Sequence, residues 1–247
     1  MLFNSTIFIF LFLPITLILF YVARSLKLNS ILILFLASLL FYSYWNPIYL
    51  PILILSIVAN FLIGKSLYKN KRRFKLAVGI GLNLSLLGYF KYKNFFLDSI
   101  NHIFNTSFEE IKIILPLGIS FFTFQQIAYL VDQYKQKTKH YSFLNYSFFV
   151  SFFPQLIAGP IVHHGTMIPQ LLKVNNIFKS LSIGISIFSI GLFKKILLAD
   201  QCGVYANQIF KTIPATLSII DSWIGTIAYS LQLYIDFSAY SDMATGL

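Results

Sequence analysis

Long apolar stretches without a charged residue divide this chain, and short basic segments separate them. Three of these stretches cover residues 1–23, 28–64 and 76–90. A helix that crosses a lipid bilayer needs about 20 mostly apolar residues. The pattern therefore predicts an all-α, polytopic transmembrane protein. It places about seven to eight spans at residues 3–23, 29–45, 48–64, 76–92, 113–131, 144–162, 178–198 and 217–240.

Prolines and glycines mark where these apolar stretches are interrupted. Asn46 and Pro47 split the run 28–64 into two helices joined by a tight turn, because proline ends one helix and suits the first turn of the next. Two prolines and a glycine lie between residues 153 and 162, at mid-membrane depth for a helix over 144–162. Non-helical backbone at that depth must be buried in protein or line a wet cavity. A re-entrant loop near 153–162 and a full span are therefore both open.

Composition supports the membrane interpretation and excludes other classes of protein. Hydrophobic residues make up 57% of the 247 residues and charged residues only 11%, whereas soluble domains carry about 25% charged residues. The net charge is +11, but the basic residues gather between apolar runs, so topology explains them and nucleic acid is not expected as a partner. The single cysteine, Cys202, excludes an intramolecular disulfide. We expect residues 1–247 to form a single membrane-embedded domain.

The basic segments also predict an orientation. Residues 24–28, 65–75 and 132–139 carry net charges of +2, +6 and +2, whereas Asn46 and residues 91–112 carry no net charge. Cytoplasmic loops of membrane proteins have an excess of Lys and Arg. The N-terminus is therefore expected outside the cytoplasm. The pair Lys194-Lys195 is expected to extend from its apolar segment to a membrane interface.

Two predicted helices carry polar residues on one face. Tyr229, Gln232, Asp236 and Tyr240 fall within a stripe about 80° wide at 100° per residue. Lipid cannot solvate the Asp236 carboxylate, so this face points into the protein. Two interpretations are equally supported. One is a clamp in which tyrosine hydroxyls or a lysine of a neighbouring helix hold Asp236, and the other is the wall of a polar tunnel. Asp242 lies on the opposite side and is expected at an interface.

The segment 115–133 shows the same pattern. One face carries Phe122, Gln125, Gln126, Tyr129 and Gln133, and Pro116 and Gly118 predict a bent or broken helix start. Hydrogen bonding between helices is the somewhat favoured interpretation of this face, and a tunnel wall is the alternative.

The four histidines do not predict a metal site. Adjacent histidines project about 100° apart on a helix, and no Asp, Glu or Cys stands near His163 and His164 in the sequence. His102 and His140 are expected in loops. The sequence shows no nucleophile motif and no glycine-rich phosphate loop.

Four stretches, in order along the chain, resemble a known family: residues 115–125, 152–164, 190–200 and 231–244. They are similar to the membrane-bound O-acyltransferases, and within them to the bacterial branch of the alginate O-acetylation protein. The resemblance implies an O-acyltransferase in the bacterial inner membrane that passes an acetyl group from a cytoplasmic donor. Periplasmic O-acetyltransferase partner proteins would place it on a cell-envelope polysaccharide such as alginate or peptidoglycan. No bound cofactor is expected, and the acyl donor, acetyl-CoA being one candidate, is a substrate.

The resemblance implies a polar tunnel but no catalytic residue within these 247 residues. In the family, the catalytic histidine follows the motif at 231–244 and is expected beyond Leu247, so the chain looks truncated and is expected to be inactive alone. Two alternatives remain, a transporter or channel subunit and an inactive truncated remnant of the enzyme. The candidate tunnel-lining residues are Gln125, Gln126, Tyr129, Gln155, His163, His164, Tyr229, Gln232, Asp236 and Tyr240.

Overall fold

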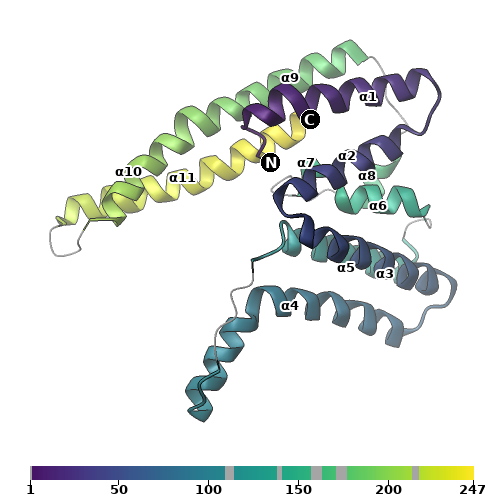
Figure 1. The fold of residues 1–247 in the computed structure, drawn as a ribbon, viewed down its shortest axis with the longest axis horizontal. Helices are drawn as coiled ribbons and strands as arrows, with labels where there is room; N and C mark the ends of the chain where they lie inside the picture. The colour runs from purple at the N-terminus through teal and green to yellow at the C-terminus, as the bar shows by residue number, and fades with distance from the viewer. Residues whose placement is uncertain (1, 109–113, 138–140, 157–162, 171–176, 213–216) are drawn as a thin grey trace. The chain divides into compact units, whose positions relative to one another are not determined.

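The computed structural model describes residues 2–108, 114–137, 141–156, 163–170, 177–212 and 217–247. Every regular element in these ranges is a helix and none is a strand, which confirms the prediction of an all-α protein (Figure 1). The described residues fall into two compact units. One comprises residues 15–156 with 163–170, and the other residues 2–14 with 177–247. That residues 1–247 form a single domain stays a prediction.

The chain begins with helices joined by short, capped turns. The side chain of Asn29 accepts a hydrogen bond from the Leu32 N–H at 3.3 Å, and that of Asn46 accepts one from the Ile48 N–H at 3.0 Å. The predicted tight turn at Asn46 and Pro47 is confirmed. These helices are η1 (Phe8–Phe12, a π-helix), α1 (Leu13–Ser25), α2 (Ser30–Trp45), η2 (Pro47–Tyr49) and α3 (Leu50–Lys69).

α4 (Arg73–Phe104) is longer than the span predicted at 76–92. No proline or glycine lies between residue 92 and Asn105, so nothing in the sequence stops the helix earlier. Asn105 has a φ of 50°, a left-handed conformation that is common just past a helix end. His102, expected in a loop, lies instead on the exposed side of the last turn of α4. His140 lies outside the described residues.

Gly118 fixes the start of α5 (Ile119–Lys135). Its φ of 66° is left-handed, and a side chain there would overlap the backbone carbonyl of Leu156. The predicted broken start at Pro116 and Gly118 is therefore confirmed.

The predicted span at 144–162 is not one continuous helix. α6 (Phe143–Ser151) ends at Phe152, whose ψ of 112° is not helical, and the short α7 (Phe153–Leu156) follows. Nine residues of α-helix are about 14 Å long, too short for a hydrocarbon core of about 30 Å. Most of the expected re-entrant loop lies outside the described residues. α8 (His164–Gln170) completes this unit.

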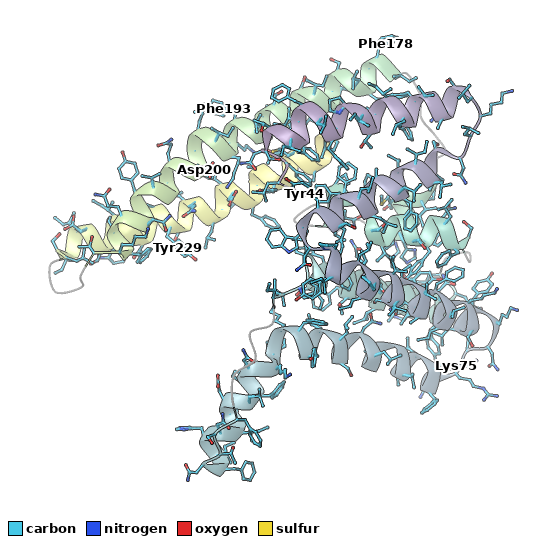
Figure 2. The ribbon with its side chains drawn as sticks, viewed as in Figure 1. Tyr44, Lys75, Phe178, Phe193, Asp200 and Tyr229 are labelled. Carbon is cyan, nitrogen blue, oxygen red and sulfur yellow. The ribbon has the colours of Figure 1, made fainter. Side chains whose placement is uncertain are left out.

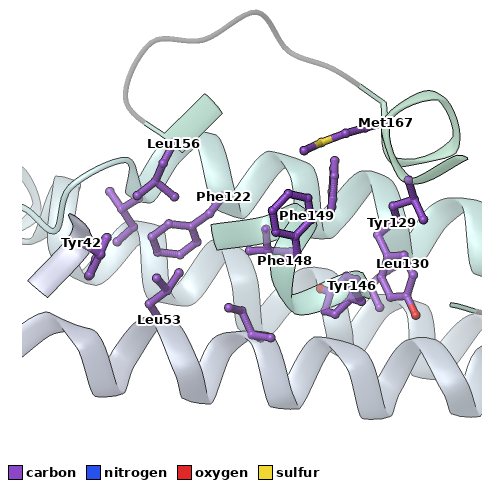
Figure 3. Close-up of a cluster of buried hydrophobic side chains, with 14 of the residues drawn as sticks. Tyr42, Leu53, Phe122, Tyr129, Leu130, Tyr146, Phe148, Phe149, Leu156 and Met167 are labelled. Atoms are coloured by element: carbon purple, nitrogen blue, oxygen red, sulfur yellow. The ribbon is translucent and has the colours of Figure 1, made fainter. Parts of the chain in front are cut away.

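A buried hydrophobic cluster joins α2, α3, α5 and α6 in the first unit (Figure 3). The rings of Tyr129 and Tyr146 are in contact within it, with centroids 4.2 Å apart and planes tilted by 36°. Gly64 of α3 permits this packing, because a side chain at that position would overlap the ring of Tyr129. The other members that the close-up labels are Tyr42, Leu53, Phe122, Leu130, Phe148, Phe149, Leu156 and Met167.

The second unit is built around two long helices that pack side by side. α9 (Ile177–Phe193), the π-helical η3 (Lys194–Ala199) and α10 (Asp200–Phe210) form one continuous helix, and α11 (Ile219–Gly246) packs along it. Ser218 and Asp221 cap α11 reciprocally. Three glycines of the continuous helix meet α11 so closely that a side chain would overlap it, with Gly184 against Gly246, Gly191 against Ala239 and Met243, and Gly203 against Gln232.

Among the described residues, three helices are long and apolar enough to cross a membrane: Phe8–Ser25, Pro47–Lys69 and Ile177–Phe210. Ser30–Trp45 is apolar but shorter. These helices expose large hydrophobic side chains, such as Phe178 and Phe193, which project outward from α9 (Figure 2). Exposed apolar side chains of this kind suit a lipid environment. The total of seven to eight spans stays a prediction.

Candidate functional site

One face of α5 carries polar side chains and is buried in the first unit. Gln126, Tyr129 and Gln133 are fully buried, and Gln125 is only 7% exposed. Phe122 shares the face, so the grouping predicted from helical spacing is confirmed. Polar groups at this depth need hydrogen-bond partners from neighbouring helices.

Gln126 joins α5 to α3, and α3 is joined in turn to α4. Its Oε1 accepts hydrogen bonds from Ser56 Oγ at 3.1 Å and from Asn60 Nδ2. Asn60 and Asn83 bond to one another twice, with Asn83 Nδ2 donating to Asn60 Oδ1 at 2.6 Å and Asn60 Nδ2 donating to Asn83 Oδ1 at 3.2 Å. The result is a polar network that links three helices.

A groove of about 280 Å³ opens beside this network between α3 and α4. Ser56, Asn60 and Asn83 form its polar floor, and its remaining lining residues are Ile52, Leu55, Ala59, Leu82 and Leu86. Sequence reasoning missed these three polar residues. The signal was present, since each interrupts an apolar run in the predicted spans 48–64 and 76–92.

Some buried polar atoms of α5 keep hydrogen-bonding capacity. Within the described residues, no hydrogen-bond partner lies near Gln126 Nε2, Tyr129 Oη or Thr123 Oγ1. A buried donor without a partner costs about 1–3 kcal/mol. Such groups are therefore candidates for contact with a bound molecule. Gln155, from α7, is also buried, at 5% exposure.

His163 and His164 lie against Asp132, at the opposite end of α5 from Gly118. Nε2 of His163 is 2.6 Å from Asp132 Oδ2, and Nε2 of His164 is 3.1 Å from the same oxygen. The statement that no acidic residue stands near the histidine pair is therefore wrong in three dimensions. Asp132 is 31 residues from His163 in the chain and comes close to it because α5 and α8 both pack on α6, which local sequence cannot show.

The two imidazoles differ in environment. The side chain of His163 is 51% exposed and that of His164 is 1% exposed. His164 packs edge-on against Tyr129, Tyr141 and Phe149. Burial, together with the neighbouring His163, lowers the pKa of His164, while Asp132 opposes this shift. His164 is therefore neutral at pH 7.

In the second unit, the polar stripe of α11 faces the helix that packs against it. Lys195 Nζ lies 2.8 Å from Asp236 Oδ1 and 2.9 Å from Asp200 Oδ1. Lys194 Nζ lies 2.6 Å from Asp242 Oδ2 and donates to Ser238 Oγ at 3.2 Å. Both lysines therefore pair with carboxylates rather than simply extending to an interface, and Asp242 has an ionic partner.

The other stripe residues of α11 contact the same helix. Gln232 packs on Gly203, and Tyr229 meets Phe210 edge-on at 5.7 Å between ring centroids. The ring of Tyr240 lies 5.7 Å from Lys195 Nζ. The clamp interpretation of Asp236 thus gains a named lysine partner, while its tunnel role stays a prediction. Of the candidate residues, Gln125, Gln126, Tyr129, Gln155, His163 and His164 belong to the first unit, and Tyr229, Gln232, Asp236 and Tyr240 belong to the second.

The sequence of this chain is similar to those of known proteins. Residues 133–247 match the membrane-bound O-acyltransferase (MBOAT) family. The chain is 43% identical over 282 aligned residues to the peptidoglycan O-acetyltransferase of Helicobacter pylori, across all of this chain and 53% of that protein. It is 37% identical over 257 residues to the probable alginate O-acetylase AlgI of Pseudomonas putida, across all of this chain and 52% of that protein. The AlgI protein of Pseudomonas aeruginosa is also 37% identical, with 49% covered.

The resemblance inferred from the motifs is confirmed. The chain is similar to the membrane-bound O-acyltransferases, and among them to bacterial proteins named for the acetylation of peptidoglycan and alginate. It spans about half the length of the curated relatives it matches.

Proposed function

We propose that this chain is part of a membrane O-acyltransferase that acetylates a cell-envelope polysaccharide. The observation that carries the proposal is the 43% identity to a peptidoglycan O-acetyltransferase along the whole of this chain. Of the two acceptors, we favour peptidoglycan in this proposal, because the identity of the chain to the alginate O-acetylases is lower, at 37%. No structural observation favours the transporter alternative.

Acetyl transfer from a cytoplasmic donor to a periplasmic glycan needs a polar route through the bilayer. The buried face of α5 supports such a route, because Gln126 and Tyr129 keep polar atoms that no described side chain satisfies. Asp236 is the corresponding candidate in the second unit, since Lys195 leaves its side chain 32% exposed. The proposed location is the bacterial inner membrane with the N-terminus outside. The proposed partners are periplasmic O-acetyltransferase proteins and a cytoplasmic acyl donor such as acetyl-CoA.

The prediction that residues 1–247 by themselves do not transfer acetyl groups also belongs to this proposal. None of their four histidines matches the family's catalytic histidine motif. Purified residues 1–247, supplied with donor, glycan and the periplasmic partners, are expected to release no product. Acetylated glycan in that reaction would overturn this prediction.

The function is tested by measuring acetate released by mild alkali from isolated peptidoglycan. Deleting the complete gene is expected to lower this acetate, and restoring the gene is expected to recover it. Unchanged peptidoglycan acetate, with a loss from another polysaccharide fraction, would refute peptidoglycan as the acceptor. No loss from any fraction would refute acetyl transfer.

The role of Asp236 is tested in the complete gene with Asp236→Asn and Asp236→Leu. If Asp236 lines the acetyl route, Asp236→Asn lowers acetylation while the amount of protein in the membrane is unchanged. If Asp236 only clamps helices, Asp236→Asn is nearly silent and Asp236→Leu lowers protein and acetylation together. Asp98→Asn, which neutralises an exposed carboxylate of α4, is the control.

A further inference from the structure

Asp132, His163 and His164 bring three metal-ligating atoms together. One carboxylate oxygen and the imidazole nitrogens all lie within 4.8 Å of one another. Asp132 comes from the last turn of α5, His163 directly precedes α8, and His164 begins it. Two segments that are far apart in the sequence therefore converge with the donor types that bind transition metals.

We propose that these three side chains form a binding site for one divalent transition-metal ion, with Zn²⁺ as the preferred ion. Two imidazole nitrogens and one carboxylate oxygen are a common set of protein ligands for zinc, with water in the fourth position. The ion would fasten α8 to the end of α5. The proposal does not depend on the proposed acetyl transfer.

The geometry needs only a small adjustment to admit the ion. The two imidazole nitrogens lie 2.6 and 3.1 Å from Asp132 Oδ2. Metal–ligand distances of about 2.0–2.2 Å in a tetrahedral site place the ligand atoms about 3.3–3.6 Å apart. Each Nε2 therefore has to move away from the oxygen by less than about 1 Å. His163 is half exposed, so its ring has room to move.

The carboxylate of Asp132 supplies the negative charge of the site, and Lys135 and Lys137 follow it in the basic segment 132–139. Within the part of the chain that the structure describes, the only ion pairs of Asp132 are with His163 and His164, and no Lys or Arg competes for its carboxylate. The carbonyl end of α5 adds negative potential at the same place.

The contacts of Nδ1 in each histidine show what changes when Nε2 binds a metal ion. Metal bound at Nε2 leaves the proton of a neutral imidazole on Nδ1. In His164, Nδ1 lies 3.5 Å from the hydroxyl oxygen of Tyr141, which can accept a hydrogen bond from that proton. In His163, Nδ1 accepts a hydrogen bond from the Gly165 N–H at 3.1 Å, so metal binding breaks this contact as the ring turns.

The position of the site suits exchange with water. It lies outside the three apolar helices that are long enough to span a membrane, and the exposed His163 gives an ion from solution a way in. Asp132 also adjoins the basic segment 132–139, which is cytoplasmic in the predicted orientation.

The test uses the full chain, purified in detergent with a non-histidine tag and stripped of metal with a chelator. Zn²⁺ affinity is measured by competition with a chromophoric chelator, and Co²⁺ reports geometry through its visible absorption. We expect one ion per chain and the intense absorption of a four-coordinate site. His163→Gln and Asp132→Asn are expected to weaken binding by at least about 100-fold, and Tyr141→Phe by about tenfold.

The matched control is His102→Gln, which removes an exposed histidine of α4 and is expected to leave binding unchanged. His163→Gln is the decisive variant, because His163 is half exposed and its replacement is compatible with folding. Wild-type protein that binds no Co²⁺, or His163→Gln protein that binds Zn²⁺ as tightly as wild type, would overturn the proposal.

A second measurement needs no variant. Diethyl pyrocarbonate modifies accessible neutral histidines, and mass spectrometry locates the modified residue. Zn²⁺ is expected to protect His163 at least about fivefold while His102 in the same sample reacts at its original rate. Equal reaction of His163 with and without Zn²⁺ would contradict the site.

Discussion

Lys195 Nζ on η3 lies 2.8 Å from Asp236 Oδ1 on α11, so an ion pair joins the two long helices of the second unit. The same ammonium group lies 2.9 Å from Asp200 Oδ1, on the first turn of α10. One lysine therefore neutralises two carboxylates. The lysine side chain is only 13% exposed, against 32% for that of Asp236, so water solvates the ammonium group less than the carboxylate.

This shared lysine predicts an unequal response to substitution. Lys195→Met leaves two carboxylates without their cation, whereas Asp236→Asn leaves Lys195 paired with Asp200. We expect Lys195→Met to destabilise the protein by about 1–2 kcal/mol, because Asp236 is about a third exposed and solvent screens part of the loss. Asp236→Asn should lower the midpoint of thermal unfolding less. An equal or reversed order would contradict the shared arrangement.

The paired asparagines of α3 and α4 predict energetic coupling. Asn60→Leu and Asn83→Leu each break the reciprocal hydrogen bonds, and the double variant removes both partners. We expect Asn60→Leu to be the more destabilising, because Asn60 also bonds to Gln126. The double-variant cycle should give a coupling energy of about 0.5–1.5 kcal/mol from thermal unfolding.

Ser85→Ala is the control for this cycle, since the hydroxyl of Ser85 bonds to the Gly81 carbonyl within its own helix. It should not couple to Asn60→Leu. Additive effects of the two asparagine substitutions would show that the pair contributes no interaction energy.

The packing of Tyr129 on α3 predicts opposite effects for two glycines. Gly64→Ala places a methyl group inside the ring of the fully buried Tyr129 and should destabilise the protein by about 1–3 kcal/mol. Gly81→Ala on α4 meets open space and should be neutral or stabilising by up to about 1 kcal/mol. Thermal unfolding of both variants in the same detergent gives the comparison. A Gly64→Ala protein as stable as the Gly81→Ala protein would refute this contact.

The loop charges predict which turns a membrane-impermeant thiol reagent reaches in intact cells. In a Cys202→Ala background, Ile48→Cys is expected to label, because the turn at Asn46 is predicted outside. Arg72→Cys, in the basic turn before α4, is expected to label only after the cells are permeabilised. Labelling of Arg72→Cys but not of Ile48→Cys in intact cells would reverse the orientation.

Local sequence was sufficient for the helical fold and for several of its breaks. The apolar runs predict helices because little else satisfies a backbone in lipid, and Pro47 and Gly118 mark breaks that depend on one residue each. The buried face of α5 follows from helical spacing alone. The end of α4 was missed because composition changes at residue 91 while the backbone has no reason to stop there.

The partners of the polar residues were beyond local sequence. Asp132 meets His163 across 31 residues and Lys195 meets Asp236 across 41, and both contacts depend on how helices pack. Spacing on one helix shows which side a carboxylate faces, but it does not show which residue comes to meet it. This is why the clamp and tunnel interpretations of Asp236 were equal on sequence grounds.

The π-helical segment η3 sets the rotational register of the long helix on either side of it. At 100° per residue, the 12 residues from Gly191 to Gly203 would turn the second glycine about 120° away from the first. A π-turn accommodates one extra residue, which brings this difference down to about 20°. Gly191 and Gly203 consequently both face α11. Deleting one residue between 194 and 199 would leave 11 residues of regular α-helix between the two glycines, a turn of about 20°, so both would still face α11; converting η3 to α-helix at its present length would instead carry Gly203 about 100° off the contact.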